Sequence, residues 1–111
     1  GTCIRDYIHV CDLAEAHVKG MDYLQKQKDN FIDFVNIGTG EGTSVLEIVR
    51  LFDEIEPNRL NYKFVDKRPG DVVAIYANTD KANVVLGWKA QSSLEEALAS
   101  AWKWEQKIRQ Q

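Results

Sequence analysis

The sequence predicts an α/β fold in which a small mixed sheet is covered by helices. Short β-branched and aromatic runs alternate with amphipathic runs of helical period, and capping boxes or glycine- and proline-containing turns separate them. The 111 residues are enough for one domain, 1–111, and too few for two. A chain of this length is expected to bury roughly two-thirds of the surface that its unfolded form exposes.

Composition and charge exclude several kinds of partner. Fourteen Lys and Arg residues against seventeen Asp and Glu give a net charge of −3 and a pI near 5.3. Nucleic acid is not expected as a partner, because affinity for a phosphate backbone comes from clustered cations. No apolar run approaches the ~18 residues that a membrane span needs, so no membrane partner is expected.

The cysteines and histidines do not form a metal or disulfide pattern. Cys3 and Cys11 are predicted to be reduced, half-buried thiols of a cytoplasmic protein. His9 and His17 lack the HExxH spacing of a metal site, so no metal is expected. Since the chain does not start with Met, it is interpreted as part of a longer protein or as a processed product.

The first three elements follow from local patterns. Residues 4–10 alternate in part between apolar and polar side chains and predict a strand. Asp12 and Glu15 have the spacing of a capping box, which predicts a helix from about residue 12 to about residue 26. Residues 31–37 are aromatic and β-branched and predict a second strand.

A glycine-rich segment, 38–43, separates the second strand from the second helix. Ser44 and Glu47 form another capping-box pattern, and an apolar stripe of helical period follows them. Pro57 is expected to end this helix, because the residue before a proline avoids helical geometry.

Two further strands are predicted on either side of a turn. Residues 60–65 alternate in polarity, and residues 72–77 form a short apolar run. Pro69 and Gly70 between them predict the turn.

Two helices complete the expected fold. Thr79 is the expected cap of a short helix over residues 80–86, which ends at Gly87. The last helix is expected to begin after Ser92 or Ser93, since each has a Glu three positions later.

The loop Gly38-Thr39-Gly40-Glu41-Gly42 lies between a predicted strand and a capped helix, which is the context of a dinucleotide fingerprint. The spacing does not match, because GxGxxG requires glycine where the chain has Thr43. Glu41 would also repel a pyrophosphate. A tight structural turn is the preferred interpretation, and dinucleotide binding is the alternative.

Arg5 and Arg68 are the candidate phosphate contacts. A guanidinium presents a planar fork that binds phosphate oxygens two at a time. Each arginine has a carboxylate close in sequence, Asp6 and Asp71, which can hold the fork or accept hydrogen bonds from vicinal sugar hydroxyls. For either arginine taken alone, a solvated surface charge is the alternative.

No catalytic constellation is visible in the sequence. GxSxG and HExxH are absent, and none of the four tyrosines is followed four positions later by a lysine. His9 and His17 are expected to be satisfied by packing. No catalytic and no cofactor-binding residue is therefore assigned.

Several blocks resemble one known family. They are 1–14 (GTCIRDYIHVCDLA), 36–47 (NIGTGEGTSVLE), 68–72 (RPGDV), 76–78 (YAN) and 86–89 (LGWK). The blocks follow one another in the family's order and cover essentially the whole chain. On these residues the chain resembles the C-terminal, substrate-binding part of UDP-glucose 4-epimerases, which belong to the extended short-chain dehydrogenase/reductase family.

The resemblance implies roles for five residues. Arg5 and Arg68 would clamp the diphosphate of a UDP-hexose, Asp71 would accept from the ribose hydroxyls, and Tyr7 would line the nucleotide pocket. Ile75 would limit the room at the C2 substituent of the sugar, which gives the hypothesis of partial tolerance for N-acetylated UDP-sugars.

The resemblance also implies a parent enzyme. In that family an N-terminal Rossmann domain holds NAD and a Tyr-x-x-x-Lys pair, hydride passes from sugar C4 to NAD, and it returns to the other face of the 4-keto sugar. The parent would be a homodimeric isomerase of galactose metabolism. Lacking that domain, this chain alone is expected neither to bind NAD nor to epimerise a sugar. Two alternatives remain, namely part of a nucleotide-sugar decarboxylase or dehydratase, and a self-standing α/β interaction module.

Overall fold

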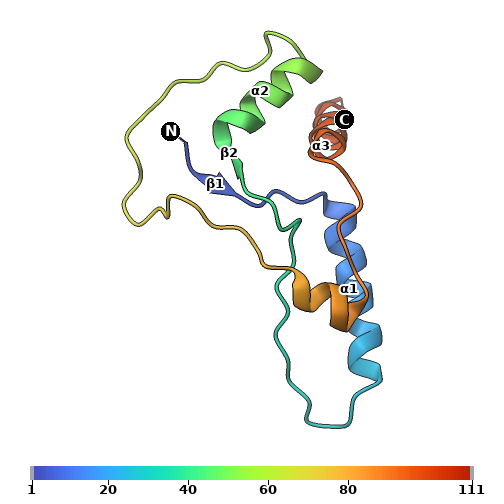
Figure 1. Ribbon diagram of the computed structural model, residues 1–111. Coiled ribbons are helices and arrows are strands. Elements are labelled where there is room, and N and C mark those ends of the chain that lie inside the picture. Colours follow the sequence, from blue (N-terminus) through green and yellow to red (C-terminus); the bar gives the residue numbers. More distant parts are fainter. Residues whose placement is uncertain (1, 111) are drawn as a thin grey trace.

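The fold is α/β, as predicted, with a very small sheet (Figure 1). The computed structural model describes residues 2–110. In chain order the elements are β1 (Ile4–Arg5), α1 (Val10–Gln25), β2 (Thr43–Ser44), α2 (Val45–Ile55), the π-helical η1 (Ala82–Leu86) and α3 (Leu94–Arg109).

The sheet is mixed because β1 has a neighbour on each side. Strand β2 pairs with it in antiparallel register, Ile4 opposite Ser44. On the other side Ile4 forms a parallel bridge with Ala74, in which its N–H donates to the carbonyl of Val73 at 2.9 Å and its carbonyl accepts from Ile75 at 3.0 Å. Strand β1 therefore lies between β2, which follows the glycine loop, and the segment that follows the Pro-Gly turn.

Two predicted capping boxes are confirmed. The side chains of Ser44 and Glu47 satisfy each other's backbone N–H groups at the start of α2, and Ser93 and Glu96 do the same at α3. Such caps stabilise a helix by about 1 kcal/mol each. Helix α2 ends at Ile55, before the proline that was predicted to stop it.

The predicted cap of α1 is wrong. The helix begins before Asp12, and its cap is His9, whose Nδ1 accepts a backbone N–H. Asp12 is buried instead, and its carboxylate accepts from the backbone N–H groups of Gln91 at 3.2 Å and Ser92 at 2.9 Å. A tertiary contact 79 or 80 residues away thus replaces the local capping role.

The predicted short helix at 80–86 is a π-helical stretch, and Gly87 ends it with a left-handed φ of 63°. Thr79 does not cap it through its side chain. The side-chain oxygen of Asn78 instead accepts from the backbone N–H of Asp80 at 3.1 Å.

Most of the predicted strands are not formed. The first strand is reduced to Ile4–Arg5, residues 72–77 contribute only the bridge at Ala74, and neither 31–37 nor 60–65 forms a strand. The reason is that a strand needs a backbone partner as well as a suitable sequence. The described residues supply no such partner for 31–37 or 60–65.

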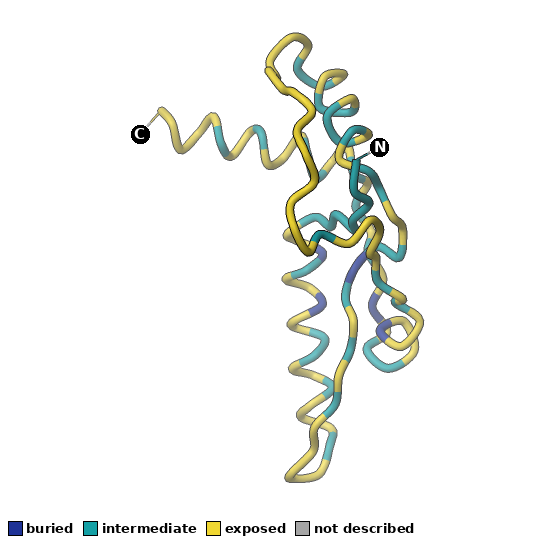
Figure 2. The backbone as a smooth tube through the Cα atoms, turned by 90° about the vertical axis from the view of Figure 1, so that its left-hand side faces the viewer, coloured by how far each residue is buried: buried dark blue, intermediate teal, exposed yellow. Residues whose placement is uncertain are grey.

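The core is small and the molecule is elongated (Figure 2). Buried apolar side chains in the described part are Ala16, Ala82 and Trp88, and the Trp88 indole donates to the Asp12 carbonyl at 3.1 Å. The radius of gyration is 17.1 Å, against about 13 Å for a compact domain of this length.

The expectation that two-thirds of the surface is buried is wrong, because the core is small and the molecule is elongated. The accessible surface is 8789 Å², whereas a compact protein of this mass exposes about 6,200 Å². Only about half of the surface of the unfolded chain is removed from water. Among residues 2–110, no helix is long and apolar enough to cross a bilayer.

Candidate functional site

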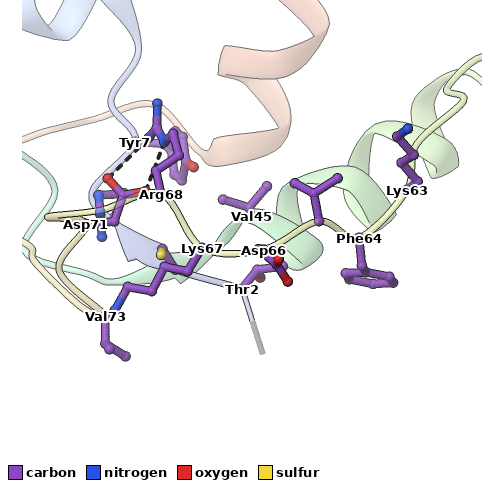
Figure 3. Close-up of a pocket in the computed structure, with 13 residues that line it drawn as sticks. Thr2, Tyr7, Val45, Lys63, Phe64, Asp66, Lys67, Arg68, Asp71 and Val73 are labelled. Carbon is purple, nitrogen blue, oxygen red and sulfur yellow. Dashed lines mark hydrogen bonds and ion pairs between the residues drawn. The ribbon is translucent and has the colours of Figure 1, made fainter.

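A cavity of about 560 Å³ lies beside β1. Its lining comes from the N-terminal segment, the start of α2 and the arm that leads into and past the Pro-Gly turn: Thr2, Cys3, Arg5, Tyr7, Val45, Lys63, Phe64, Val65, Asp66, Lys67, Arg68, Asp71 and Val73. Four of the five residues expected to bind substrate are in this set. In Figure 3, Tyr7, Arg68 and Asp71 are grouped at one end of the cavity, and Lys63 and Phe64 lie at the other.

The alternation of the extended chain around β1 selects which side chains reach the cavity. Cys3, Arg5 and Tyr7 line it, whereas Ile4 and Asp6 contact the glycine loop. Successive side chains of an extended backbone point to opposite faces, so two-residue spacing places Arg5 and Tyr7 on the cavity side.

The guanidinium of Arg5 is fixed by two carbonyl groups. Its Nη1 donates to the carbonyl of Ile4 at 2.8 Å and to that of Val72 at 2.9 Å. No hydrogen bond or ion pair joins Arg5 to Asp6 in the described chain, so the first of the two roles suggested for this carboxylate, holding the fork, is wrong. Within residues 2–110, Nε and Nη2 of Arg5 make no hydrogen bond, so these donors are accessible to a ligand.

Arg68 and Asp71 form the predicted local pair. Nε of Arg68 donates to Oδ2 of Asp71 at 2.9 Å, and Nη2 donates to Oδ1 at 3.3 Å. The turn that brings them together has Gly70 in the left-handed region, with φ at 84°. The Arg68 side chain is 83% exposed and that of Asp71 is 24% exposed, so the cation is accessible to a ligand.

Sequence reasoning missed two further cations, Lys63 and Lys67, which also line the cavity. With Arg5 and Arg68 they give four cationic side chains against Asp66 and Asp71. An excess of positive charge around a cavity attracts an anion, although the chain as a whole is acidic. The basic residues between positions 63 and 68 were the available signal in the sequence.

Ile75 does not line this cavity. It borders a second hollow of about 430 Å³, together with Asp6, Asn36, Tyr76 and other residues. Among residues 2–110, Arg5 alone lines both hollows.

The glycine loop is a structural turn in which the N–H groups of Thr39 and Gly40 are already occupied. The carboxylate of Asp6 accepts from the backbone N–H of Thr39 at 2.9 Å and from that of Gly40 at 3.0 Å. A Cβ on Gly38 would overlap the Asp6 carboxylate and would meet the Cβ of Ala77 at 2.9 Å. These contacts favour the structural interpretation over dinucleotide binding, because a phosphate would need the same N–H groups.

The histidines and cysteines form no centre of their own. His9 caps α1 and its Nε2 lies 3.1 Å from the Ser100 hydroxyl, and His17 Nδ1 lies 2.8 Å from the carbonyl of Leu13. Within residues 2–110, no group of three His, Cys, Asp or Glu side chains could hold a metal. Cys3 and Cys11 are free thiols; Cys3 is half-buried as predicted and Cys11 is exposed.

A family model described as GDP-mannose 4,6 dehydratase matches residues 1–101. The chain belongs to this family. Among curated members, the UDP-glucose 4-epimerase of Bacillus subtilis is 45% identical over 105 residues, which are 95% of this chain and 30% of that protein. The chain thus spans about a third of the length of the curated relatives that it matches.

Solved structures of the family have the same fold. The UDP-glucose 4-epimerase of Stenotrophomonas maltophila, with bound NAD and formylated UDP-arabinopyranose, matches with a TM-score of 0.90 and 37% identity over 98% of this chain and 32% of that chain. The enzyme of Bifidobacterium longum, in complex with NAD+ and UDP, matches with a TM-score of 0.86 and 39% identity over 96% of this chain and 31% of that chain. The resemblance seen in the sequence blocks is confirmed.

Proposed function

We propose that this chain is the UDP-sugar-binding part, a single domain over residues 1–111, of an NAD-dependent UDP-glucose 4-epimerase of the cytoplasm. The observation that carries the proposal is the convergence of Arg5 and Arg68, 63 positions apart, on one cavity beside the Asp71 carboxylate. Two guanidinium forks match the two phosphates of a nucleoside diphosphate. The epimerase relatives and their complexes with NAD and UDP support this assignment.

The geometry supports the roles that the family resemblance implies. Arg5 binds the diphosphate from a fixed position, since Val72 and Ile4 anchor one edge of its guanidinium. Arg68 binds it from the exposed turn, and Asp71 accepts from the ribose hydroxyls. Tyr7 lines the nucleotide pocket.

Tight binding of the nucleotide suits epimerisation. The sugar must turn between the loss and the return of hydride at C4, so the enzyme has to bind the part of the substrate that does not react. Binding energy from the UDP group then positions a loosely held hexose.

The rest of the enzyme is proposed to be a Rossmann domain that holds NAD and the Tyr-x-x-x-Lys pair, in a homodimer. The small core and large exposed surface of this chain are what a part of a larger unit would show. The purified chain is therefore expected to form no UDP-galactose from UDP-glucose and NAD. Turnover by the chain alone would overturn this division of roles.

UDP binding tests the proposal directly. We expect the chain to bind UDP with a dissociation constant on the order of millimolar, about −4 kcal/mol, because part of the pocket comes from elsewhere. A titration followed by NMR should show saturable shifts with UDP and weaker ones with uridine, which lacks the diphosphate. Equal affinity for the two ligands, or no saturable shift, would refute the arginine clamp; sub-micromolar affinity would refute the incomplete pocket.

Ile75 is proposed to set the room near the C2 substituent of the sugar. It borders the second hollow, which adjoins the first through Arg5. The parent enzyme is expected to turn over UDP-N-acetylgalactosamine more slowly than UDP-galactose. Complete inertness toward the N-acetylated substrate in steady-state assays would rule this out.

A nucleotide-sugar dehydratase is the second candidate, since the matched family model has that description. The two activities differ in product. The parent enzyme should convert UDP-glucose to UDP-galactose without loss of water, and release of a 4-keto-6-deoxy sugar would favour the second candidate.

A further inference from the structure

The Asp6 carboxylate joins three segments that are distant in sequence. Its Oδ1 accepts from the N–H of Thr39 at 2.9 Å and from the hydroxyl of the same residue at 2.7 Å. Its Oδ2 accepts from the N–H of Gly40 at 3.0 Å and from that of Ala77 at 3.2 Å. Both oxygens are thus fully used, and every partner is a donor.

The donors favour the ionised form of Asp6. Partial burial raises the pKa of this carboxyl, but the hydrogen bonds from Thr39, Gly40 and Ala77 outweigh it, and the pKa lies below its ordinary value. The side chain therefore acts as an internal anion that occupies the N–H groups of Thr39 and Gly40, which a phosphate at this loop would also need.

The same residue fixes one end of the segment that leads away from the cavity. Segment 72–77 is held at Val72 by Arg5 and at Ala77 by Asp6, and Ile4 bridges it in between. Asp71 precedes this segment directly. A displacement at Ala77 would therefore change how both Arg5 and Asp71 face the cavity.

We propose that Asp6 is a positioning residue for the nucleotide site. It holds the glycine loop and Ala77 against one face of the chain at β1, and this keeps Arg5 and Tyr7 on the opposite face, directed at the cavity. It also keeps diphosphate away from the loop. The inference rests on the proposed function, because it concerns the same UDP site.

An amide at position 6 could not accept all of the hydrogen bonds that the carboxylate accepts. In Asp6→Asn one oxygen becomes an NH₂ group, which would face N–H donors of Gly40 and Ala77 or of Thr39. Two donors facing each other repel and leave both unsatisfied. The shape of the side chain is unchanged, so the variant tests the charge and the acceptors.

Asp12→Asn is the matched control. Asp12 also accepts from two backbone N–H groups of a distant segment, those of Gln91 and Ser92, but unlike Asp6 it forms no hydrogen bond to the glycine loop or to segment 72–77. Thr39→Val is a milder variant that removes one of the four donors to Asp6 and retains the three amides.

The experiment is a UDP titration of the whole chain and the three variants, followed by NMR on the folded signals. We expect the dissociation constant to rise about tenfold in Asp6→Asn, two- to threefold in Thr39→Val, and less than twofold in Asp12→Asn. If Asp6→Asn does not fold, Thr39→Val decides. Unchanged affinity for UDP in the deciding variant, Asp6→Asn or otherwise Thr39→Val, would overturn the positioning role. An equal loss of affinity in Asp12→Asn would overturn it too. In both cases the proposed function stands. Absence of UDP binding by the unmodified chain would overturn both.

Discussion

Arg68 and Asp71 are paired side by side across the Pro-Gly turn, with Nε donating to Oδ2 at 2.9 Å and Nη2 to Oδ1 at 3.3 Å. The pair places a cation proposed to bind phosphate next to a carboxylate proposed to bind ribose. Because the carboxylate orients the guanidinium, the two functions of the turn are linked.

The planar guanidinium of Arg68 is expected to contribute more to UDP binding than its charge alone. Arg68→Lys should raise the dissociation constant for UDP about tenfold, because lysine keeps the charge but cannot bind two oxygens in one plane. Isothermal titration or NMR would measure it. Arg109→Lys, in an arginine–carboxylate pair with Glu105 on α3, is the control and should leave UDP binding unchanged. Equal effects of both substitutions would contradict a specific role.

Two glycines should respond in opposite directions to alanine. Gly38→Ala should destabilise the chain by about 1–3 kcal/mol, because the new methyl group would overlap the Asp6 carboxylate. Gly20→Ala should stabilise it by about 0.5–1 kcal/mol, because this helical position in α1 has open space. Urea denaturation measures both. A neutral Gly38→Ala would show that the loop is not packed against Asp6.

Trp88 is expected to contribute more to the free energy of unfolding than any other side chain of the small core. It is 1% exposed and its indole bonds the Asp12 carbonyl, so Trp88→Ala should cost about 3–5 kcal/mol. Trp104 on α3 is 60% exposed, and Trp104→Ala should change stability by less than about 0.5 kcal/mol. Similar losses from the two substitutions in a denaturant titration would argue against the described core.

Asp33 should make stability depend on acid pH. Hydrogen bonds from Lys81, Tyr23 and the Phe34 N–H lower its pKa to about 2. Since the folded value lies below the ordinary value of 3.8, the stabilisation is present above about pH 4 and is lost as the pH falls through about 2.

Thermal melts between pH 4 and pH 2 would test this. Asp33→Asn should flatten the fall in melting temperature over this range. Asp29→Asn, which changes an exposed carboxylate of the preceding loop, should follow the unmodified chain. If both variants retained the full slope, the acid sensitivity would have another origin.

Local signals in the sequence predicted the helices well. The capping boxes at Ser44 and Ser93 depend on residues three positions apart, so their partners could be identified from the chain alone. Asp12 showed the limit of this reasoning. It had the same local pattern, but its carboxylate binds Gln91 and Ser92, which no local rule reveals.

Strands and the site depended on long-range partners. Residues 31–37 have a strand-like sequence, yet Ile32 and Phe34 are 81% and 82% exposed and belong to no strand of the described chain. The candidate arginines were found by residue type and family resemblance. The role of Asp6 was missed, because its partners lie 33 to 71 positions away.

The most direct test of the central claim is a titration of the chain with UDP while the side-chain ¹⁵Nε signals of Arg5 and Arg68 are observed by NMR. If one diphosphate lies between them, both signals shift with the same dissociation constant, and neither shifts with uridine at equal concentration. A shift of only one arginine, or two different binding curves, would show that the two guanidiniums do not share a ligand.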